Sequence, residues 1–185
     1  DVMMPRMNGY KLCKTIKEDI NISHIPVILL TARDDRQSQI SGYKNGADGY
    51  LSKPFEVEML MELIRNRLKN REYTKKRYLN AGLIPTPEES TISLTDETFL
   101  IKLNSIIQEN IENSNLGIQF ICQEVGLGRS SLYNKLKALT GMGANEYISK
   151  LRIEKAITLI SGTDMPFSEI AEKTGFTTPS YFSTA

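Results

Sequence analysis

Three residues in the first half of the chain could together handle a phosphoryl group: Asp1, Thr31 and Lys53. Thr31 ends the apolar segment 26–31 (PVILLT), Lys53 follows the segment 48–52 (DGYLS), and Asp1 stands where a further strand would end. A carboxylate can accept a phosphoryl group, and a hydroxyl and an ammonium beside it can bind the phosphate oxygens. Sites in open parallel sheets form at the carboxyl edge of the strands, so we expect these three side chains to lie together.

The segments around these residues alternate between strand-like and helix-like patterns. Residues 34–47 form a polar, helix-length segment that one of its leading aspartates can begin and Gly46 can end. Strands separated by a helix predict parallel pairing with a right-handed crossover. Lys53 precedes Pro54, so the peptide between them can be cis and would aim the lysine inward. Apolar helical faces flank the two strands, the first formed by Tyr10, Cys13, Ile16 and Ile20, the second by Val57, Leu60, Met61, Ile64 and Leu68.

Beyond the second of these faces the chain changes character. The basic segment 65–77 continues the helix, and it either relays a signal to the second half or presents a solvated face. Residues 80–94 combine two prolines, a glycine and many hydroxyl groups, which indicates a linker. We therefore divide the chain into an α/β part at 1–79, a partial doubly wound layer, and an all-α part at 95–185.

Every segment after the linker is helix-like. Thr95 can cap the first helix, with Asp96 and Glu97 in its first turn, where the helix dipole favours acids. The buried stripe of this helix is predicted to be Phe99, Leu103, Ile106, Ile107 and Ile111. Further helices are expected at about 118–125, 130–139, 144–160 and 168–174, and from near Thr178.

The all-α part contains an internal repeat. Residues 121–133 (ICQEVGLGRSSLY) match residues 170–182 (IAEKTGFTTPSYF), with Gly126 equivalent to Gly175. Each copy has a short helix with a small residue midway, a glycine at its end, an apolar residue in the turn and a second helix. This order is typical of a helix-turn-helix unit, because the glycine supplies a left-handed turn and the apolar residue fills the junction.

The second helix of each copy carries side chains suited to DNA. Arginine can bridge guanine and asparagine can pair with adenine in a major groove, while hydroxyls and lysines suit phosphates. The candidate DNA-binding residues are Arg129, Ser130, Ser131, Asn134, Lys135 and Lys137 in the first unit, and Thr177, Thr178, Ser180, Tyr181 and Ser183 in the second. The first set has a local charge of +3, which offsets the net acidity of residues 81–185. Two solvated helical hairpins are the alternative, which the repeat disfavours.

The helix between the units sets their separation. Residues 144–160 would span roughly 25 Å at about 1.5 Å per residue. With the thickness of a helix added at each end, the two units could meet successive major grooves about 34 Å apart.

Residues 95–185 resemble the DNA-binding domain of AraC-type transcriptional regulators. The similarity runs through SSLYNKLKALTG, NEYISKLRIEKAITLI, FSEIAEKTGF and PSYF. It implies two helix-turn-helix units that bind double-stranded DNA. GMGANEY departs from the Ser-Pro or Thr-Pro start that is usual in the family, and the family continues beyond SYFSTA, so the last helices are expected to be incomplete.

Residues 1–70 resemble the receiver domain of two-component response regulators. The similarity is carried by DVMMPRMNG, PVILLTA and GADGYLSKPF. It implies that Asp1 is the phosphoacceptor, Thr31 the switch hydroxyl, Lys53 the family's lysine and Tyr50 the aromatic residue that swings between states. It also implies Mg²⁺ at Asp1 and the backbone carbonyl of Met3. The family's first two strands, first helix and acidic pair would precede Asp1, so we expect an incomplete metal site and no phosphorylation of this segment by a small donor.

The combined resemblance predicts a phosphorylation-controlled transcription regulator of a two-component system, and not an enzyme. Its expected partners are operator DNA, a histidine kinase as phosphodonor and a second copy of the phosphorylated protein. An alternative makes the first block an interaction module with constitutive DNA binding. A haloacid-dehalogenase-like phosphatase would need an aspartate in place of Met3. The region around residues 83–100 also resembles the join in hybrid sensor kinases, so this segment could be the cytoplasmic end of a membrane-anchored sensor.

The charge, the hydrophobic content and the cysteine and histidine counts exclude some further classes of protein. The net charge of +1 and 40% hydrophobic content fit ordinary globular domains, and no apolar run reaches membrane length. The two cysteines, Cys13 and Cys122, are far apart within helical patterns, which indicates free thiols in a cytoplasmic, reducing compartment. His24 stands alone before Ile25 and Pro26, so it is interpreted as a loop residue and not a metal ligand.

Overall fold

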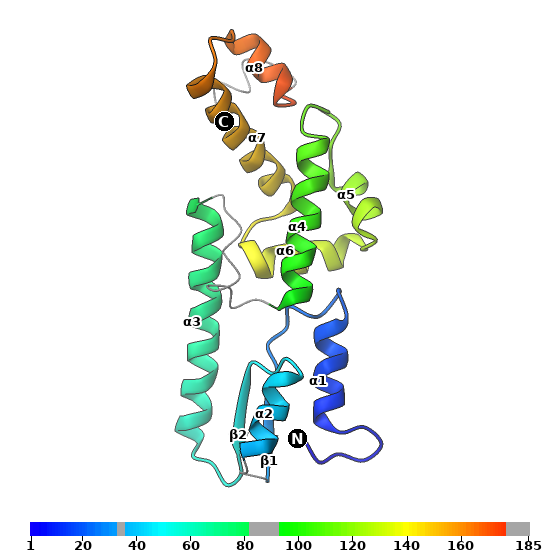
Figure 1. The fold of residues 1–185 in the computed structure, drawn as a ribbon, viewed down its shortest axis with the longest axis vertical. Coiled ribbons are helices and arrows are strands. Elements are labelled where there is room, and N and C mark those ends of the chain that lie inside the picture. Colours follow the sequence, from blue (N-terminus) through cyan, green and yellow to red (C-terminus); the bar gives the residue numbers. More distant parts are fainter. Residues whose placement is uncertain (33–35, 82–92, 177–185) are drawn as a thin grey trace.

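The computed structural model describes residues 1–32, 36–81 and 93–176, and for residues 36–39 and 77–81 it describes the backbone only. Two blocks follow one another along the long axis of the molecule (Figure 1). The first block carries both described strands, and the second is helical in its described part. The predicted class, a partial α/β layer joined to an all-α part, is confirmed.

The first block is built on two short parallel strands. β1 (Ile28–Thr31) pairs with β2 (Gly49–Ser52), and α2 (Arg36–Lys44) connects them. Gly46 follows the connecting helix, as the sequence predicts, and its φ of +82° puts it in a left-handed turn. The Asn8 side chain caps α1 (Gly9–Glu18). Val2, Cys13, Leu29 and Ala47 form the small buried core.

The helix α3 (Val57–Ala81) runs from the sheet to the second block (Figure 1). Its predicted apolar face is only partly buried, because Val57, Met61 and Leu68 are 66%, 42% and 53% exposed. The prediction is wrong for these three residues because two four-residue strands cover little of a helix of this length. The far half of α3 instead packs against a helix of the second block, and Thr74 is buried there.

The second block contains five described helices: α4 (Leu94–Glu109), α5 (Ile118–Val125), α6 (Arg129–Thr140), α7 (Ala144–Gly162) and α8 (Phe167–Lys173). They lie close to the predicted ranges. The predicted stripe of α4 is buried in full and forms one core with α5, α6 and the start of α7. The Tyr147 hydroxyl donates to Asn104 Oδ1 at 2.7 Å and ties α7 to α4. The helix predicted from Thr178 lies outside the described residues.

The cap of α4 differs from the prediction. Ser93 is the N-cap, and its hydroxyl accepts a hydrogen bond from the Asp96 backbone N–H at 3.2 Å. Thr95 instead donates its hydroxyl to the Lys17 carbonyl of the first block at 2.9 Å. The Thr95 prediction is wrong because a contact between the blocks takes up that hydroxyl.

The repeat is present in three dimensions in the parts that are described. Gly126 and Gly175 both have left-handed backbones, with φ of +73° and +71°. The residue after each glycine donates its N–H to the equivalent carbonyl, Leu127 to Cys122 at 3.1 Å and Phe176 to Ala171 at 2.9 Å. Leu127 and Phe176 are both buried. The two first helices therefore end in the same way, as the sequence predicts.

The two blocks meet at a polar interface, here called the seam. Ile20 lies beyond the end of α1 and packs against the core of the helical block, not against the core of its own block. The seam is formed by Lys17, Ile20, Ser23 and His24 of the first block, Arg71 and Thr74 of α3, and Thr95, Asp96, Lys135 and Leu139 of the helical block. Among the described residues, no helix has the length and apolarity that a membrane span requires.

Candidate phosphoacceptor edge and nucleic-acid interface

Asp1 and Lys53 meet at the carboxyl edge of the sheet. The Val2 N–H donates to the Leu30 carbonyl at 2.9 Å, which holds the start of the chain against β1. The Lys53 N–H donates to the Thr31 carbonyl at 2.6 Å, directly beyond β2. Across this edge, Lys53 Nζ donates to Asp1 Oδ1 at 2.6 Å. The expected proximity of these two side chains is therefore present in the structure.

The backbone around Lys53 also has the expected form. The Lys53–Pro54 peptide bond is cis. The side chains of Lys53 and Asp1 are 43% and 48% exposed, so their ion pair is open to solvent. A carboxylate in this position is accessible to a phosphodonor, and the ammonium beside it is placed to bind a phosphate oxygen.

Thr31 and Tyr50 lie on the two strands behind this pair. Thr31 is the last residue of β1 and is buried, and it lies opposite Ser52 in the parallel register. Tyr50 is half-buried on β2, with its ring against α2, where a Cβ at Gly42 would lie 3.1 Å from the ring. The movement of both residues between states remains a prediction.

The donors for a magnesium ion are few on the described part of the chain. Asp1 contributes one carboxylate, which Lys53 already contacts, and Met3 could add a backbone carbonyl. No group of three or more His, Cys, Asp or Glu side chains that could hold a metal is present among the described residues. Magnesium prefers six oxygen ligands in a near-octahedral arrangement. Asp1 and the Met3 carbonyl alone supply fewer oxygens than this arrangement needs, so the magnesium site stays a prediction for the intact receiver.

The first helix-turn-helix unit presents a polar face on α6. Arg129, Ser130, Asn134 and Lys137 are exposed, and Ser131 is half-buried. Ser130, Asn134 and Lys137 recur at intervals of four and three residues, so they share one face of the helix. Arg129 Nη2 lies 3.5 Å from the Gln119 Oε1 of α5. This face can enter a major groove, where arginine and asparagine contact base edges.

Lys135 does not belong to this face, and its assignment as a DNA contact is contradicted in this arrangement. The Lys135 side chain is fully buried, forms an ion pair with Asp96 and donates to Ser23 Oγ at 2.7 Å. Its ammonium also lies 5.1 Å from the centre of the Phe99 ring. Burial lowers the pKa of the Lys135 ammonium, and the hydrogen bond to Asp96 offsets part of that shift.

A helical-spacing argument could have identified Lys135. It falls in the buried stripe of α6 between Leu132, Leu136 and Leu139, where a lysine needs an acidic partner. The sequence pattern places this partner, Asp96, only in the first turn of α4, where an acid suits the helix dipole. Ser23 and His24 carry no such sequence signal, because their burial depends on contact with the other block.

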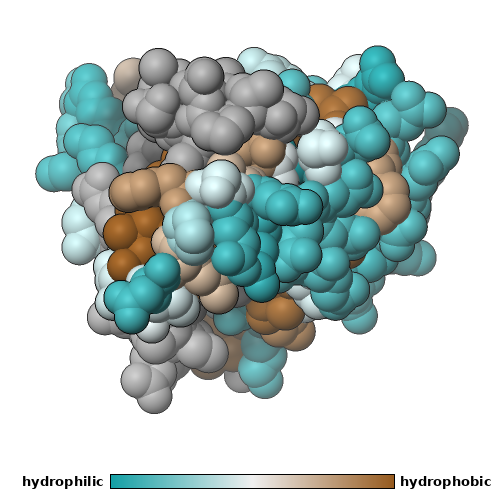
Figure 2. Space-filling view, turned by 90° about the horizontal axis from the view of Figure 1, so that it is seen from above, coloured by the Kyte–Doolittle hydropathy of each residue, from teal (hydrophilic) through white to brown (hydrophobic). Residues whose placement is uncertain are grey.

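The second unit's candidate contacts are not placed by the structure. Thr177, Thr178, Ser180, Tyr181 and Ser183 lie outside the described residues. The described surface around α7 and α8 is mostly hydrophilic, with hydrophobic residues scattered across it (Figure 2).

Two family models match the chain. The response regulator receiver domain matches residues 1–65, and a helix-turn-helix domain matches residues 121–185. These matches cover the sheet edge with Asp1 and Lys53 and the α6 face, respectively.

The chain is similar to several known proteins. "Histidine kinase P4" of Formosa agariphila is 43% identical over 183 residues, which is 99% of this chain and 13% of that protein. "Probable transcriptional regulator ycf29" of Pyropia yezoensis is 29% identical over 157 residues, or 79% of this chain and 71% of that protein. The C-terminal domain of AraT, a response regulator from Geobacillus stearothermophilus, is 29% identical with a TM-score of 0.44, covering 46% of this chain and 71% of that one. The chain thus spans only a small part of the first of these relatives.

Each candidate site lies within one of the matched segments. The acceptor edge falls in the first matched segment and the polar face of α6 in the second. The chain thus carries a response regulator receiver-domain segment at residues 1–65, followed by a helix-turn-helix domain at residues 121–185.

Proposed function

We propose that the protein to which this chain belongs is a DNA-binding transcription regulator whose receiver is controlled by phosphorylation of Asp1. The observation that carries this proposal is the pairing, in one chain, of an open Asp1–Lys53 acceptor edge with an exposed polar face on α6. The acceptor edge supplies a carboxylate for the phosphoryl group, and the α6 face supplies base-reading and phosphate-binding side chains.

The roles of the individual residues follow from their chemistry. Asp1 would accept the phosphoryl group from a histidine kinase, and Lys53 and Thr31 would bind its oxygens. Arg129 and Asn134 would read bases, while nearby hydroxyls and Lys137 would hold phosphates. The equivalent contacts of the second unit would come from residues 177–183. Magnesium would support phosphoryl transfer in the complete receiver, and a second copy of the phosphorylated protein would place further units on the DNA.

The DNA contacts are tested on a duplex selected in vitro with the full-length protein. Arg129→Ala and Asn134→Ala should each weaken binding roughly 5- to 150-fold, which corresponds to the loss of about 1–3 kcal/mol for one bidentate base contact. Lys44→Ala, which removes an exposed cation from α2, is the matched control and should leave affinity unchanged. Equal binding by the wild type and the three variants would contradict the assignment of α6 as the helix that contacts bases.

Control by phosphorylation is tested on the same duplex. Treatment with a small acyl phosphate and magnesium should tighten binding of the full-length protein, and Asp1→Asn should abolish that gain without changing base preference. If footprints are the same with and without the donor, the first block acts as an interaction module and the phosphorylation proposal fails.

A further inference from the structure

The helix α7 connects the two helix-turn-helix units, but only its first half belongs to the core of the first unit. That core includes α7 up to Leu151. Further along, Ile157 and Ile160 are 57% and 44% exposed. The part of α7 from Arg152 to Gly162, here called the arm, is about 16 Å long at about 1.5 Å per residue. The second unit begins with α8, which packs against this helix, so its position depends on the direction of the arm.

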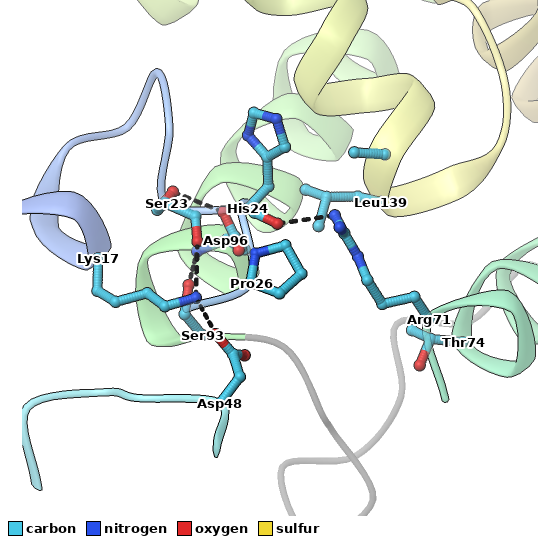
Figure 3. A pocket seen from close by; sticks show the side chains of 11 residues that line it. Lys17, Ser23, His24, Pro26, Asp48, Arg71, Thr74, Ser93, Asp96 and Leu139 are labelled. Atoms are coloured by element: carbon cyan, nitrogen blue, oxygen red, sulfur yellow. Dashed lines mark hydrogen bonds and ion pairs between the residues drawn. The ribbon is translucent and has the colours of Figure 1, made fainter. Parts of the chain in front are cut away.

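The first unit is fixed to the first block by the seam. Figure 3 shows Ser23 and His24 beside Asp96, with Arg71 reaching in from α3. Ser23 Oγ donates to Asp96 Oδ1 at 2.7 Å, and Arg71 Nη2 donates to the His24 carbonyl at 2.7 Å. The first unit is thus the fixed reference, and the separation of the two units changes when the arm of α7 moves.

Arg152 holds the arm at the point where α7 leaves the core. Its Nη2 donates to the Asn113 carbonyl at 2.7 Å, in the loop that follows α4. The same carbonyl accepts the Leu116 N–H at 3.0 Å, so the loop is ordered by its own turn. The Nε atom of Arg152 is buried. The guanidinium is therefore enclosed against the first unit and does not extend freely into solvent.

The turn of the second unit closes over the same guanidinium. Gly175 is buried, and a Cβ there would lie 2.2 Å from the Ile111 carbonyl oxygen and 2.9 Å from Arg152 Nη2. Ile111 follows α4 and belongs to the core of the first unit. Figure 1 shows the end of α8 beside the loop that follows α4. Arg152 thus lies between a carbonyl of the first unit and the turn of the second.

The internal repeat shows that this contact is not a general feature of the turn. Gly126 and Gly175 are equivalent and have the same left-handed backbone. Gly126 is exposed, however, and a Cβ there would meet nothing within 4 Å in the described part of the chain. Both turns need a glycine for their φ, but the close approach to Ile111 and Arg152 belongs to the second copy. This second glycine also lets one unit dock on the other.

A small tilt of the arm is enough to change which DNA sites fit. A tilt of about 10° at Arg152 would move the far end of the roughly 16 Å arm by about 3 Å. Successive base pairs are about 3.4 Å apart along the duplex. The tilt is therefore equivalent to about one base pair in the separation of the two half-sites, and a contact that prevents it selects one separation.

We propose that Arg152 is a positioning residue for DNA recognition. Together with Asn113, Ile111 and Gly175 it forms a clamp that fixes the second unit on the first, and the clamp sets the half-site spacing that the protein accepts. Arg152 needs no contact with DNA for this role. The inference rests on the proposed function and deepens it, because it names the side chain that determines spacing.

Two variants of the full-length protein open the clamp, and each has a matched control. Arg152→Leu removes the hydrogen bond to Asn113; Lys155→Leu removes the same charge from the same helix, but its ion pair with Glu112 is exposed and contributes little. Gly175→Ala forces the turn away from Ile111, whereas Gly126→Ala introduces the same left-handed strain without a clash. Circular dichroism and thermal unfolding establish that each variant folds.

The decisive measurement is the affinity ratio of each protein for two duplexes: the selected one, and the same duplex with one base pair inserted between the two segments that the wild type protects. The insertion should weaken binding about fivefold or more for the wild type, Lys155→Leu and Gly126→Ala, which is the loss of at least one bidentate base contact. For Arg152→Leu and Gly175→Ala it should weaken binding less than about twofold. General loss of stability or charge affects both duplexes and cancels in the ratio.

The clamp itself is measured without DNA, by amide hydrogen exchange of the peptide that covers residues 110–116. Its protected amides should exchange at least about tenfold faster in Arg152→Leu than in the wild type, because the loop loses its contact with α7. In Lys155→Leu the rates should stay within about threefold of the wild type.

Each other outcome overturns a defined part of the inference. Unchanged exchange in Arg152→Leu would show that this side chain does not hold the loop. Faster exchange with an unchanged affinity ratio would show that α7 alone sets the spacing, and a wild type that tolerates the insertion would show that the spacing is not fixed. If exchange responds as expected but neither the wild type nor any variant binds DNA, the proposed function fails with the spacing role, while the clamp stands.

Discussion

Removal of Asp96 should destabilise the helical block strongly and in a pH-dependent way. Asp96→Ala takes away the acidic partner of Lys135, whose ammonium is fully buried beneath Ser23. Loss of one member of a buried ion pair typically costs about 3–5 kcal/mol, because the other charge is left buried and unpaired. For a chain of this size, that corresponds to a fall in Tm of about 6–20 °C.

The proton equilibrium of Lys135 sets an upper limit on this cost. Burial already lowers its pKa from the usual 10.5, and the hydrogen bond to Asp96 is the largest effect that raises it, so Asp96→Ala should lower it further. At pH 7 the folded variant can release the proton of Lys135. Measured from the usual lysine pKa of 10.5, this release costs about 5 kcal/mol, at 1.36 kcal/mol per pH unit. The unfolded chain holds the proton up to about pH 10.5, so the deficit should shrink as pH rises toward that value.

The assay is urea unfolding of the wild type and the variant at pH 7 and at pH 9.5. Asp164→Ala removes an exposed acid from the same block and should change the unfolding free energy by less than about 0.5 kcal/mol. The double variant Asp96→Leu/Lys135→Met should recover most of the loss, because it removes both buried charges. A deficit under about 1 kcal/mol at pH 7, or one that does not shrink at pH 9.5, would refute the argument from the buried pair.

The chain's single histidine should make the seam sensitive to mild acid. Burial, and then the charge of Lys135, lower the pKa of His24 below its usual 6.5. As the pH drops from about 6.5, the unfolded chain takes up a proton before the folded protein does, so the stability of the folded protein falls until the pH reaches the folded pKa. His24→Gln should flatten this part of the curve of Tm against pH. Gly175→Ala should cost more than Gly126→Ala, for which about 1–2 kcal/mol of left-handed strain is expected. A Cβ at Gly175 would lie 2.2 Å from the Ile111 carbonyl oxygen, whereas nothing lies within 4 Å at Gly126. Lys53→Met should change the unfolding free energy by less than about 1 kcal/mol, because its ion pair is exposed, yet abolish the phosphate-dependent gain in DNA affinity measured on the selected duplex.

Local sequence patterns predicted the parts of the fold that depend on nearby residues. The two parallel strands, the glycine that ends each short helix and the buried stripe of α4 all follow from patterns within one element or between successive elements. The cap of α4 could not be chosen in this way, because Ser93 and Thr95 both offer hydroxyls. The choice is decided by the Lys17 carbonyl, which belongs to the other block.

The same difference between local patterns and contacts across the blocks decides which site residues could be predicted. The meeting of Asp1 and Lys53 could be predicted, because parallel strands bring their carboxyl ends to one edge. Lys135 was misassigned because a charge count treats every lysine of a basic helix as exposed. Helical spacing places Lys135 in the buried stripe of α6, but its partners Asp96 and Ser23 lie far away in the sequence, and no local pattern identifies them.

The acceptor edge and the seam are connected by one element. The helix α3 begins at Val57, shortly after Lys53, and its far half packs against α6. Its 25 residues make a rod of about 37 Å at 1.5 Å per residue, so a tilt of about 5° at the sheet would move its far end by about 3 Å. Such a shift exceeds the tolerance of a 2.7 Å hydrogen bond like that of Arg71 to the His24 carbonyl. A helix-breaking Asn70→Pro in the exposed middle of α3 should therefore loosen the contact of Arg71 with the His24 carbonyl and lower the Tm in thermal unfolding, while leaving the Asp1–Lys53 contact in place.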